Sequence, residues 1–153
     1  MSVEKMIEGL HLTPLKIFED DRGSVFHMLR SDSPTFRGFG EVYFSSVRHK
    51  AIKAWKRNLI ATANLTVPVG GIDLVIFDNR ASSPTRGNVV QLTTGGTNFV
   101  LITVPPNVWY GFRGREYPES LIANCLDRPY DSSTVDECTY PNESIPHIWP
   151  ELG

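Results

Sequence analysis

Histidine and cysteine are both scarce in this chain of 153 residues, which limits the metal and disulfide chemistry that it can carry. The histidines form no His-x-His or His-xxx-His pair, and the cysteines form no Cys-x-x-Cys pair, so we expect no metal site. We also expect reduced thiols, as is usual in the cytoplasm. The six residues concerned are His11, His27, His49, His147, Cys125 and Cys138.

Long apolar runs and an excess of one charge are also missing. No run approaches the ~20 apolar residues that span a bilayer, and no N-terminal signal segment is visible, so we expect a cytoplasmic protein. Fifteen basic and 17 acidic residues give a net charge of −2. This balance provides no overall basic field for a nucleic acid or an anionic membrane. An anionic ligand would have to meet local positive groups.

The composition is that of a folded β-protein. Hydrophobic residues make up 41% of the chain and charged residues 21%, values typical of one globular domain over residues 1–153. Glycines and prolines separate short segments rich in β-branched and aromatic residues, which predicts an antiparallel meander closed as a barrel or packed as a sandwich. The predicted strands are Gly23–Arg30, Gly40–Val47, Ile60–Gly70, Gly71–Asp78, Asn88–Thr94 and Asn98–Pro105.

Smaller features complete this outline. Gly70 and Gly71 favour a two-residue hairpin turn, and a short helix could begin at Val3–Met6. Asp78 and Arg80, in FDNR, predict an Asx-type turn at the rim of the barrel. The chain has no phosphate-binding GxxxxGK[ST] loop, no GxSxG nucleophile motif and no basic-aromatic stripe for nucleic acid.

Two further stretches, IKAWKRN (residues 52–58) and PPNVWYGF (residues 105–112), lie where a small barrel often carries histidines. They carry Lys56 and Tyr110 instead. Strict alternation along a strand places Lys53 and Lys56 on opposite faces, with Arg57 on the face of Lys53. On this pattern Lys56 has no assured cationic neighbour.

Several motifs occur in an order that resembles the dTDP-4-dehydrorhamnose 3,5-epimerase family, over roughly residues 12–150. The resemblance implies a cupin-like jelly roll, or double-stranded β-helix, that forms a homodimer and binds a nucleotide sugar without metal or organic cofactor. It also implies removal of a proton beside a 4-keto group and its return on the opposite face. The motifs are DDRGSVF (20–26), FGEVYFSS (39–46), GGIDLVIFDNR (70–80), VPPNVWYGF (104–112) and IPHIWP (145–150).

The resemblance implies that the usual acid-base residues are replaced. Lys56 takes the place of the family's histidine base, Asn142 that of its aspartate partner, Tyr110 that of a second histidine, and Ala123 that of the tyrosine acid. Three interpretations stay open: Lys56 and Tyr110 form an acid-base pair, Lys56 is an electrostatic anchor, or both residues are structural. A lysine ordinarily has a pKa of about 10.4, so a base at this position requires burial or a neighbouring cation.

The resemblance also implies substrate-binding residues, and two functions remain possible. Arg22 corresponds to an arginine that contacts the diphosphate across the dimer, and Lys53 keeps positive charge at another arginine position. The protein is predicted to be an epimerase or isomerase with an altered acid-base set, or else an inactive protein that binds a sugar nucleotide or another small molecule. The remaining predicted substrate-binding residues are Glu41, Phe26 and Tyr130.

Overall fold

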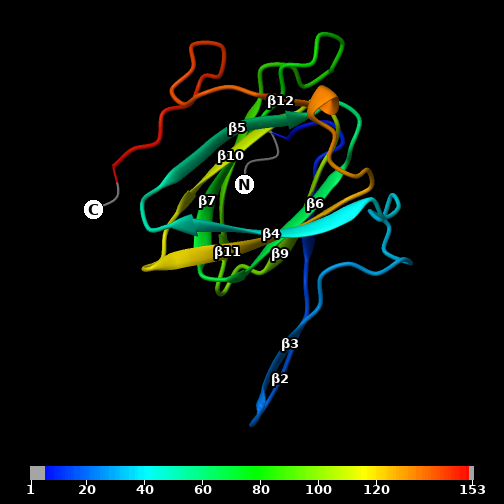
Figure 1. Ribbon diagram of the computed structural model, residues 1–153, viewed down its shortest axis with the longest axis vertical. Coiled ribbons are helices and arrows are strands. Elements are labelled where there is room, and N and C mark those ends of the chain that lie inside the picture. Colours follow the sequence, from blue (N-terminus) through cyan, green and yellow to red (C-terminus); the bar gives the residue numbers. More distant parts are fainter. Residues whose placement is uncertain (1–5, 152–153) are drawn as a thin grey trace.

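The protein, described here by a computed structural model over residues 6–151, consists of two antiparallel five-stranded sheets and one projecting hairpin (Figure 1). We call the two sheets the β4 sheet and the β5 sheet. The predicted all-β fold class is confirmed. The β4 sheet has the order β1 (His11–Pro14), β9 (Val100–Val104), β6 (Ala63–Val69), β11 (Glu119–Leu126) and β4 (Glu41–Arg48). The β5 sheet has the order β12 (Val135–Glu137), β5 (Ile52–Asn58), β10 (Trp109–Gly114), β7 (Gly71–Phe77) and β8 (Val89–Gly95).

Helical structure is minimal. A single 3₁₀ turn, η2 (Ser132–Thr134), occurs within the described part of the chain, and the helix predicted to begin at Val3 falls mainly on residues 1–5, outside the described residues. None of the helical structure within residues 6–151 has the length and hydropathy needed to cross a membrane.

The predicted meander is wrong, because consecutive strands mostly alternate between the two sheets. Gly70 has the expected positive φ of 83°, but it joins β6 of the β4 sheet to β7 of the β5 sheet and forms no hairpin. Ser120 of β11 fixes this corner: its hydroxyl accepts a hydrogen bond from Gly71 N–H at 3.0 Å and donates one to Gly71 O at 2.9 Å. A Cβ atom on Gly70 would lie 2.4 Å from Ser120 Oγ, so glycine is required there.

Apolar residues pack on both faces of the β5 sheet. The inward side chains of β7, such as Leu74 and Ile76, join the core between the sheets. The alternate residues Val75 and Phe77 face outward and pack with the C-terminal segment. In this outer cluster the rings of Trp55 and Trp149 stack with their centroids 5.0 Å apart. The C-terminal segment therefore covers the outside of the β5 sheet instead of entering the barrel.

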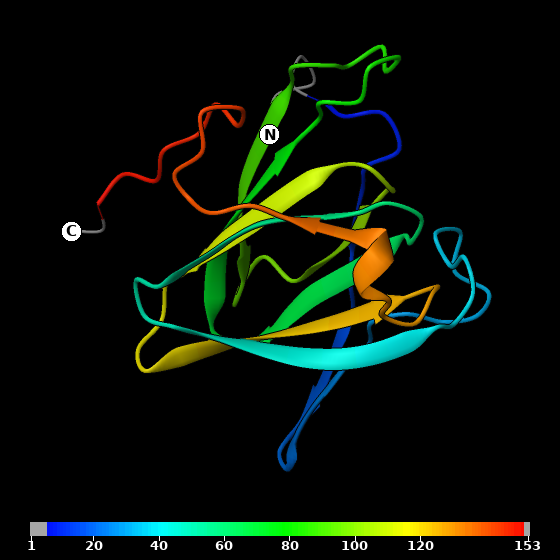
Figure 2. The ribbon, with the colours of Figure 1, turned by 45° about the horizontal axis from the view of Figure 1, so that its top comes forward.

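The hairpin formed by β2 (Ile17–Asp20) and β3 (Gly23–Phe26) projects from the body of the protein (Figures 1 and 2). All eight of its strand residues are exposed. A two-stranded hairpin buries too little surface to be stable alone in water. Its position is therefore suited to contact with a second surface.

A polar cluster holds the loop after β7, as the predicted Asx-type turn requires. Asp78 Oδ1 accepts a hydrogen bond from Arg80 N–H at 3.1 Å and from Arg80 Nε at 2.9 Å. Asp78 Oδ2 accepts one from each of the Ser83 and Thr85 hydroxyls, both at 2.6 Å. Burial raises the pKa of Asp78, but the hydrogen bonds from Arg80, Ser83 and Thr85 outweigh it, so that the net pKa lies well below the ordinary value.

We expect this cluster to make stability depend on pH. The pKa of Asp78 is lower in the folded than in the unfolded protein, so its stabilising effect is present above about pH 4, the unfolded value, and is lost as the pH falls toward the folded pKa. Asp78→Asn should lower the free energy of unfolding at pH 7 by about 3 kcal/mol and flatten its dependence on pH below 5. Urea unfolding between pH 3 and 7 measures both effects, and equal pH slopes in the two proteins would contradict the assignment.

Candidate active site

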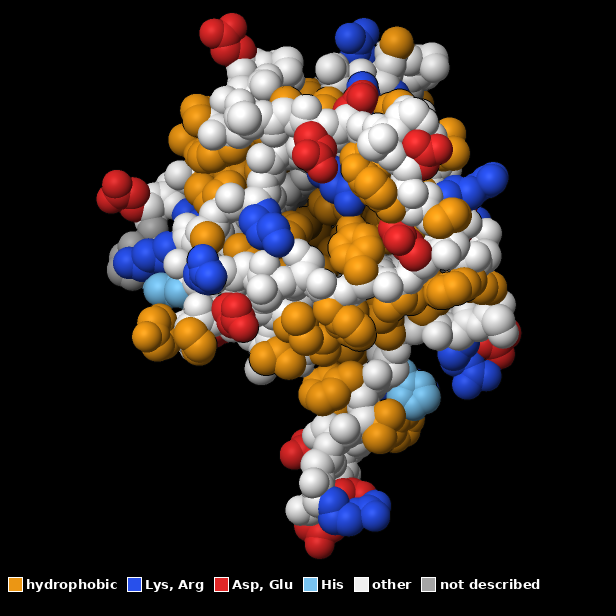
Figure 3. Space-filling view, in the orientation of Figure 1, with side chains coloured by type: hydrophobic (Ala, Val, Ile, Leu, Met, Phe, Trp, Pro, Cys, Tyr) orange, Lys and Arg blue, Asp and Glu red, His pale blue; other side chains and the backbone are white. Residues whose placement is uncertain are grey.

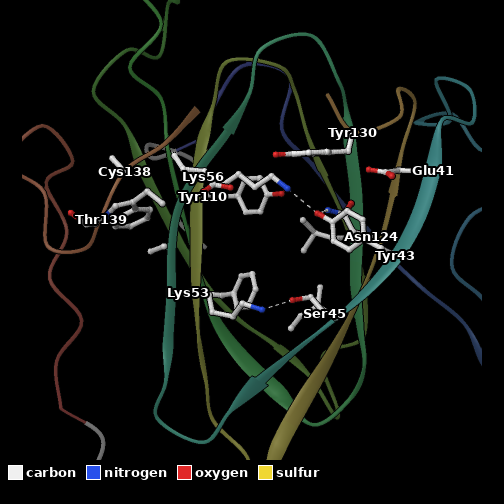
Figure 4. A pocket seen from close by; sticks show the side chains of 16 residues that line it. Glu41, Tyr43, Ser45, Lys53, Lys56, Tyr110, Asn124, Tyr130, Cys138 and Thr139 are labelled. Carbon is white, nitrogen blue, oxygen red and sulfur yellow. Dashed lines mark hydrogen bonds between the residues drawn. The ribbon is translucent and has the colours of Figure 1, made fainter. Parts of the chain in front are cut away.

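A cavity of about 720 Å³ lies between the two sheets. It is visible as the hollow at the centre of the space-filling view (Figure 3), and its lining side chains are drawn in Figure 4. The β4 sheet contributes Glu41, Tyr43, Ser45, Leu65, Ile122 and Asn124. The β5 sheet and the residues after β12 contribute Lys53, Ala54, Trp55, Lys56, Tyr110, Phe112, Glu137, Cys138 and Thr139, and the segment after β11 contributes Tyr130.

A bulge in β5 turns both lysines toward this cavity. Lys56 pairs with Tyr110 and Lys53 pairs with Phe112, so three steps along β5 match two steps along β10. The extra residue cancels the alternation, and the prediction that the two lysines face opposite sides is wrong. Arg57 faces away from the cavity, where it forms an ion pair with Asp136. Lys56 therefore has a cationic neighbour on its own face, Lys53.

Gly111 makes room for this bulge. A Cβ atom at position 111 would lie 2.5 Å from Ala54 Cβ and 3.0 Å from Ala54 Cα. Real Cβ atoms do not approach that closely, so only glycine lets β10 pack against the bulged part of β5. The glycine of the YGF sequence thus helps to determine where Lys53 and Lys56 point.

Lys56 belongs to a polar group that joins the two sheets. Its ammonium group donates a hydrogen bond of 3.0 Å to the Tyr43 hydroxyl, and the Asn124 amide Nδ2 donates another of 3.0 Å to the same oxygen (Figure 4). Tyr43 and Asn124 are direct cross-strand partners in β4 and β11. Asn124 was not among the predicted site residues, and Tyr43 was considered only as an aromatic residue that could stack on a base or a sugar. Alternation along β4 could have identified Tyr43, because it shares the face of Glu41.

Two buried polar atoms at this group have no hydrogen-bond partner within the described residues. They are the hydroxyl of Tyr110 and Oδ1 of Asn124, on side chains that are 4% and 3% exposed. Burial, reinforced by the neighbouring Tyr43, raises the pKa of Tyr110 well above that of an ordinary phenol. Unpartnered buried polar groups are costly. Here they line a cavity, so a bound ligand can supply their partners.

Lys53 places a second positive charge in the cavity. Its ammonium group donates hydrogen bonds to Ser45 Oγ at 2.7 Å and to Ser46 O at 3.1 Å. Within residues 6–151, neither Lys53 nor Lys56 forms an ion pair with a carboxylate. Two such ammonium groups on one wall can bind the phosphates of an anionic ligand.

The structure does not bring two of the predicted positions to the cavity. The side chain of Asn142 accepts hydrogen bonds from Ser144 N–H and Ser144 Oγ, and it is not a lining residue because the chain after Thr139 passes over the outer face of the β5 sheet. Ala123 is likewise absent from the lining, since its neighbours Ile122 and Asn124 point inward. The place beside Lys56 that was assigned to Asn142 is occupied by Tyr43.

Five predicted residues do lie at the cavity, and two lie on the projecting hairpin. Arg22, near the hairpin tip, forms an exposed ion pair of 2.7 Å with Asp20. The ring of Phe26 packs edge-on against Phe99, 5.4 Å between centroids. Both are remote from the cavity lining of their own chain. The residues at the cavity are Lys56, Tyr110, Lys53, Glu41 and Tyr130, as Figure 4 shows.

The charged side chains that line the cavity are two lysines, Lys53 and Lys56, and two carboxylates, Glu41 and Glu137. No group of three possible metal ligands occurs in the part of the chain that the structure describes. Both cysteines are free thiols, with Cys125 buried and Cys138 at the edge of the cavity. Burial raises the pKa of each thiol above its ordinary value, which makes a reactive thiolate unfavourable.

The jelly-roll barrel of this chain is also the fold of sugar epimerases and isomerases of known structure. No family model matches the chain. A dTDP sugar isomerase from Desulfovibrio desulfuricans G20 superimposes with a TM-score of 0.91 and 42% identity, covering 94% of this chain and 92% of that one. The probable low-salt glycan biosynthesis epimerase Agl13 of Haloferax volcanii is 30% identical over 137 residues, 88% of each chain.

A more distant structure has the same fold. The dTDP-4-dehydrorhamnose 3,5-epimerase of Bacillus anthracis superimposes with a TM-score of 0.82 at 20% identity, covering 94% of this chain and 86% of the other. The chain belongs to the dTDP-4-dehydrorhamnose 3,5-epimerase family of sugar epimerases and isomerases. The family implied by the sequence motifs is thereby confirmed.

Proposed function

We propose that this protein epimerises or isomerises a nucleotide-linked 4-keto sugar in the cavity between its sheets, without a cofactor. The observation that carries the proposal is the polar group on one wall of the cavity. It combines two ammonium groups without carboxylate partners and two buried polar atoms without any partner in the described chain. This wall is complementary to a ligand that carries phosphate charge and oxygen atoms.

The nucleotide part of the substrate is inferred from charge and from the relatives. The 42% identical protein from Desulfovibrio desulfuricans is a dTDP sugar isomerase. Lys53 is proposed to bind the diphosphate as a point charge, without the two-pronged geometry of an arginine. Glu41 and Tyr130, at the same cavity, are proposed to contact the sugar or the base.

Lys56 and Tyr110 are proposed to hold the oxygen that becomes negatively charged when a proton leaves the carbon beside the keto group. Lys56 is proposed as an electrostatic anchor: its amino group lies 3.0 Å from the Tyr43 hydroxyl, and as an ammonium group it has no lone pair with which to take a proton. Because its pKa is raised, Tyr110 stays a neutral phenol that can donate a hydrogen bond to an enolate oxygen. Donors placed in advance of the reaction stabilise such charge strongly.

A second candidate is a binding protein of the same fold that does not catalyse the reaction. The feature that favours it is the composition of the cavity lining, which has no histidine and lacks Asn142. Sugar-nucleotide binding by Lys53 and Lys56 would persist in that case. The two candidates differ only in whether a carbon-bound proton is moved.

Proton exchange separates these candidates. The protein is incubated in deuterated water with dTDP-4-keto-6-deoxyglucose, and ¹H NMR follows the protons at C3 and C5, while calorimetry measures binding of dTDP. An epimerase or isomerase must exchange at least one of these protons. Binding without exchange would favour the binding protein, and neither binding nor exchange would refute both candidates for this nucleotide.

The homodimer implied by the sequence motifs is also proposed, with the outer face of β4 and the β2–β3 hairpin as the contact surface. Val42 and Phe44 alternate with the cavity residues of β4 and are exposed, Phe44 by 66%. Val25 and Phe26 on the hairpin add further exposed apolar surface. Figure 3 shows apolar side chains gathered in a band just above the hairpin. A second copy would bury this surface and contact Arg22 of the hairpin.

The cytoplasmic location expected from the sequence stays a prediction.

We expect Phe44→Glu to produce a monomer, because a buried unpaired carboxylate in an apolar contact is costly. Sedimentation equilibrium measures the mass of each protein. Ile148→Glu is the matched control: Ile148 is 67% exposed but lies on the C-terminal segment, so the control should stay dimeric. A wild-type monomer, or a dimeric Phe44→Glu protein, would contradict the proposed surface.

A further inference from the structure

The hydroxyl of Tyr43 has an unusual set of partners. Its oxygen accepts hydrogen bonds from Lys56 Nζ and from Asn124 Nδ2, each 3.0 Å long. A phenol oxygen has two acceptor positions and one proton to donate. Both acceptor positions are filled, and an ammonium group offers no acceptor in return. The proton of Tyr43 must therefore be directed away from these two groups.

Within residues 6–151 the Tyr43 hydroxyl accepts these two hydrogen bonds and donates none, although the unpartnered hydroxyl of Tyr110 lies near it and has a pKa that Tyr43 raises. Tyr43 lines the cavity and extends from β4 toward Lys56 of β5, across the space between the sheets (Figure 4). A ligand in the cavity is thus an available acceptor. The lysine and the amide would stabilise the negative charge left on the oxygen after the proton has gone, because both are donors to it.

From this arrangement we propose that Tyr43 is the residue that returns a proton to the substrate carbon beside the keto group. The proposal rests on the proposed function and deepens it by naming the proton-transfer residue. In the return step, the O–H bond of Tyr43 breaks and a C–H bond forms at the enolate carbon. The electron pair of the enolate oxygen re-forms the C=O bond, and the electron pair of the O–H bond stays on the phenolate oxygen beside Lys56.

Tyr43 is better placed for this transfer than its two neighbours. Loss of a proton from Tyr110 is opposed by its burial, which raises its pKa. Lys56 is held as a donor to Tyr43. The oxygen of Tyr43 accepts a hydrogen bond from an ammonium group as well as from an amide, whereas no lysine or arginine within residues 6–151 donates to the oxygen of Tyr110. Of the two tyrosines that meet at the site, Tyr43 is therefore the one whose charged form has a cation beside it.

The proton-exchange assay tests this inference when it is run on variants. In a wild-type protein that exchanges, Tyr43→Phe should slow exchange at the substrate carbon at least about a hundredfold, the usual scale of acid-base catalysis. Binding of dTDP should change by less than about threefold. Tyr117→Phe is the matched control, since Tyr117 is 84% exposed and lies outside the cavity lining, and it should exchange at the wild-type rate.

The outcomes separate this inference from the proposed function. If the wild-type protein binds dTDP but does not exchange, the proposed catalytic function fails. If the wild-type protein exchanges and Tyr43→Phe exchanges equally fast, the function stands and the role of Tyr43 is refuted. A melting temperature of Tyr43→Phe within a few degrees of the wild type shows that the variant is folded.

A role of Tyr43 limited to positioning Lys56 predicts a different result. Substitution of Tyr43 by 3,5-difluorotyrosine keeps the hydroxyl and the ring but makes the phenol more acidic. If Tyr43 transfers the proton, the pH profile of exchange should shift toward lower pH in this protein. An unshifted profile at full exchange rate would assign Tyr43 to positioning and would overturn the proposal.

Discussion

Replacing Lys56 by methionine is expected to lower kcat/KM for the nucleotide-linked 4-keto sugar by about 10²–10³-fold. Methionine keeps the apolar stem of the side chain but removes the ammonium group that donates to Tyr43 at 3.0 Å. The charge that develops on the enolate oxygen, and on Tyr43 after proton transfer, then has no cation beside it. Steady-state kinetics on the purified protein measure the effect, and most of it should appear in kcat.

Lys53→Met is the matched control for this prediction. Lys53 lines the same cavity and loses the same charge, but its donors are directed to Ser45 and Ser46, away from Tyr43. We expect it to weaken binding of dTDP several-fold and to leave kcat at saturating substrate largely unchanged. Equal losses of kcat in the two variants would show that the lysines act together as a general positive field. Full activity of Lys56→Met would remove Lys56 from the reaction.

Gly111→Ala is expected to destabilise the protein by about 3 kcal/mol, the upper end of the cost of overpacking a core. The new methyl group would meet Ala54 Cβ at 2.5 Å, Ala54 Cα at 3.0 Å and a ring carbon of Trp55 at 3.0 Å. Since backbone atoms are among these neighbours, the clash cannot be relieved by a side-chain rotation. The bulged segment of β5 must shift, and Lys53 and Lys56 must shift with it.

Urea unfolding monitored by tryptophan fluorescence measures this loss, and the exchange assay measures its effect on activity. Gly71→Ala is the control, because a Cβ at Gly71 would make only ordinary contacts, the nearest at 3.5 Å from Thr94 O. It should cost less than about 1 kcal/mol. A Gly111→Ala protein with wild-type stability would mean that β5 and β10 can separate without cost, contrary to the pairing described above.

Strands rich in β-branched residues were predictable from the sequence, but the pairing of strands within the sheets was not. β7 and β9 fall within predicted segments, because β-branched residues dominate them. β11 was not predicted. Its sequence, ESLIANCL, is buried along most of its length and therefore does not alternate between apolar and polar residues. The corner at Gly70 carries the glycines of a hairpin, and its contacts are distant in sequence: Gly71 exchanges hydrogen bonds with Ser120, 49 residues away.

Most of the predicted binding and catalytic residues lie at the candidate site, but their relative orientation was not predicted. Lys56, Tyr110, Lys53, Glu41 and Tyr130 all lie at the cavity. The shared face of the two lysines was missed, because a bulge depends on the partner strand as well as on the strand that contains it. The polar role of Tyr43 was missed because it depends on Lys56 of the opposite sheet, a contact that local sequence patterns do not encode.

The most direct test of the account is a crystal structure of the protein with dTDP-glucose, whose 4-hydroxyl occupies the place of the keto oxygen. We predict that the sugar lies in the cavity, with O4 within hydrogen-bond distance of Lys56 Nζ and Tyr110 Oη, and with the diphosphate next to Lys53. The side chain of Tyr43 should lie against the carbon adjacent to C4. A nucleotide sugar bound outside the cavity, or with its sugar ring turned away from Lys56 and Tyr110, would contradict the account.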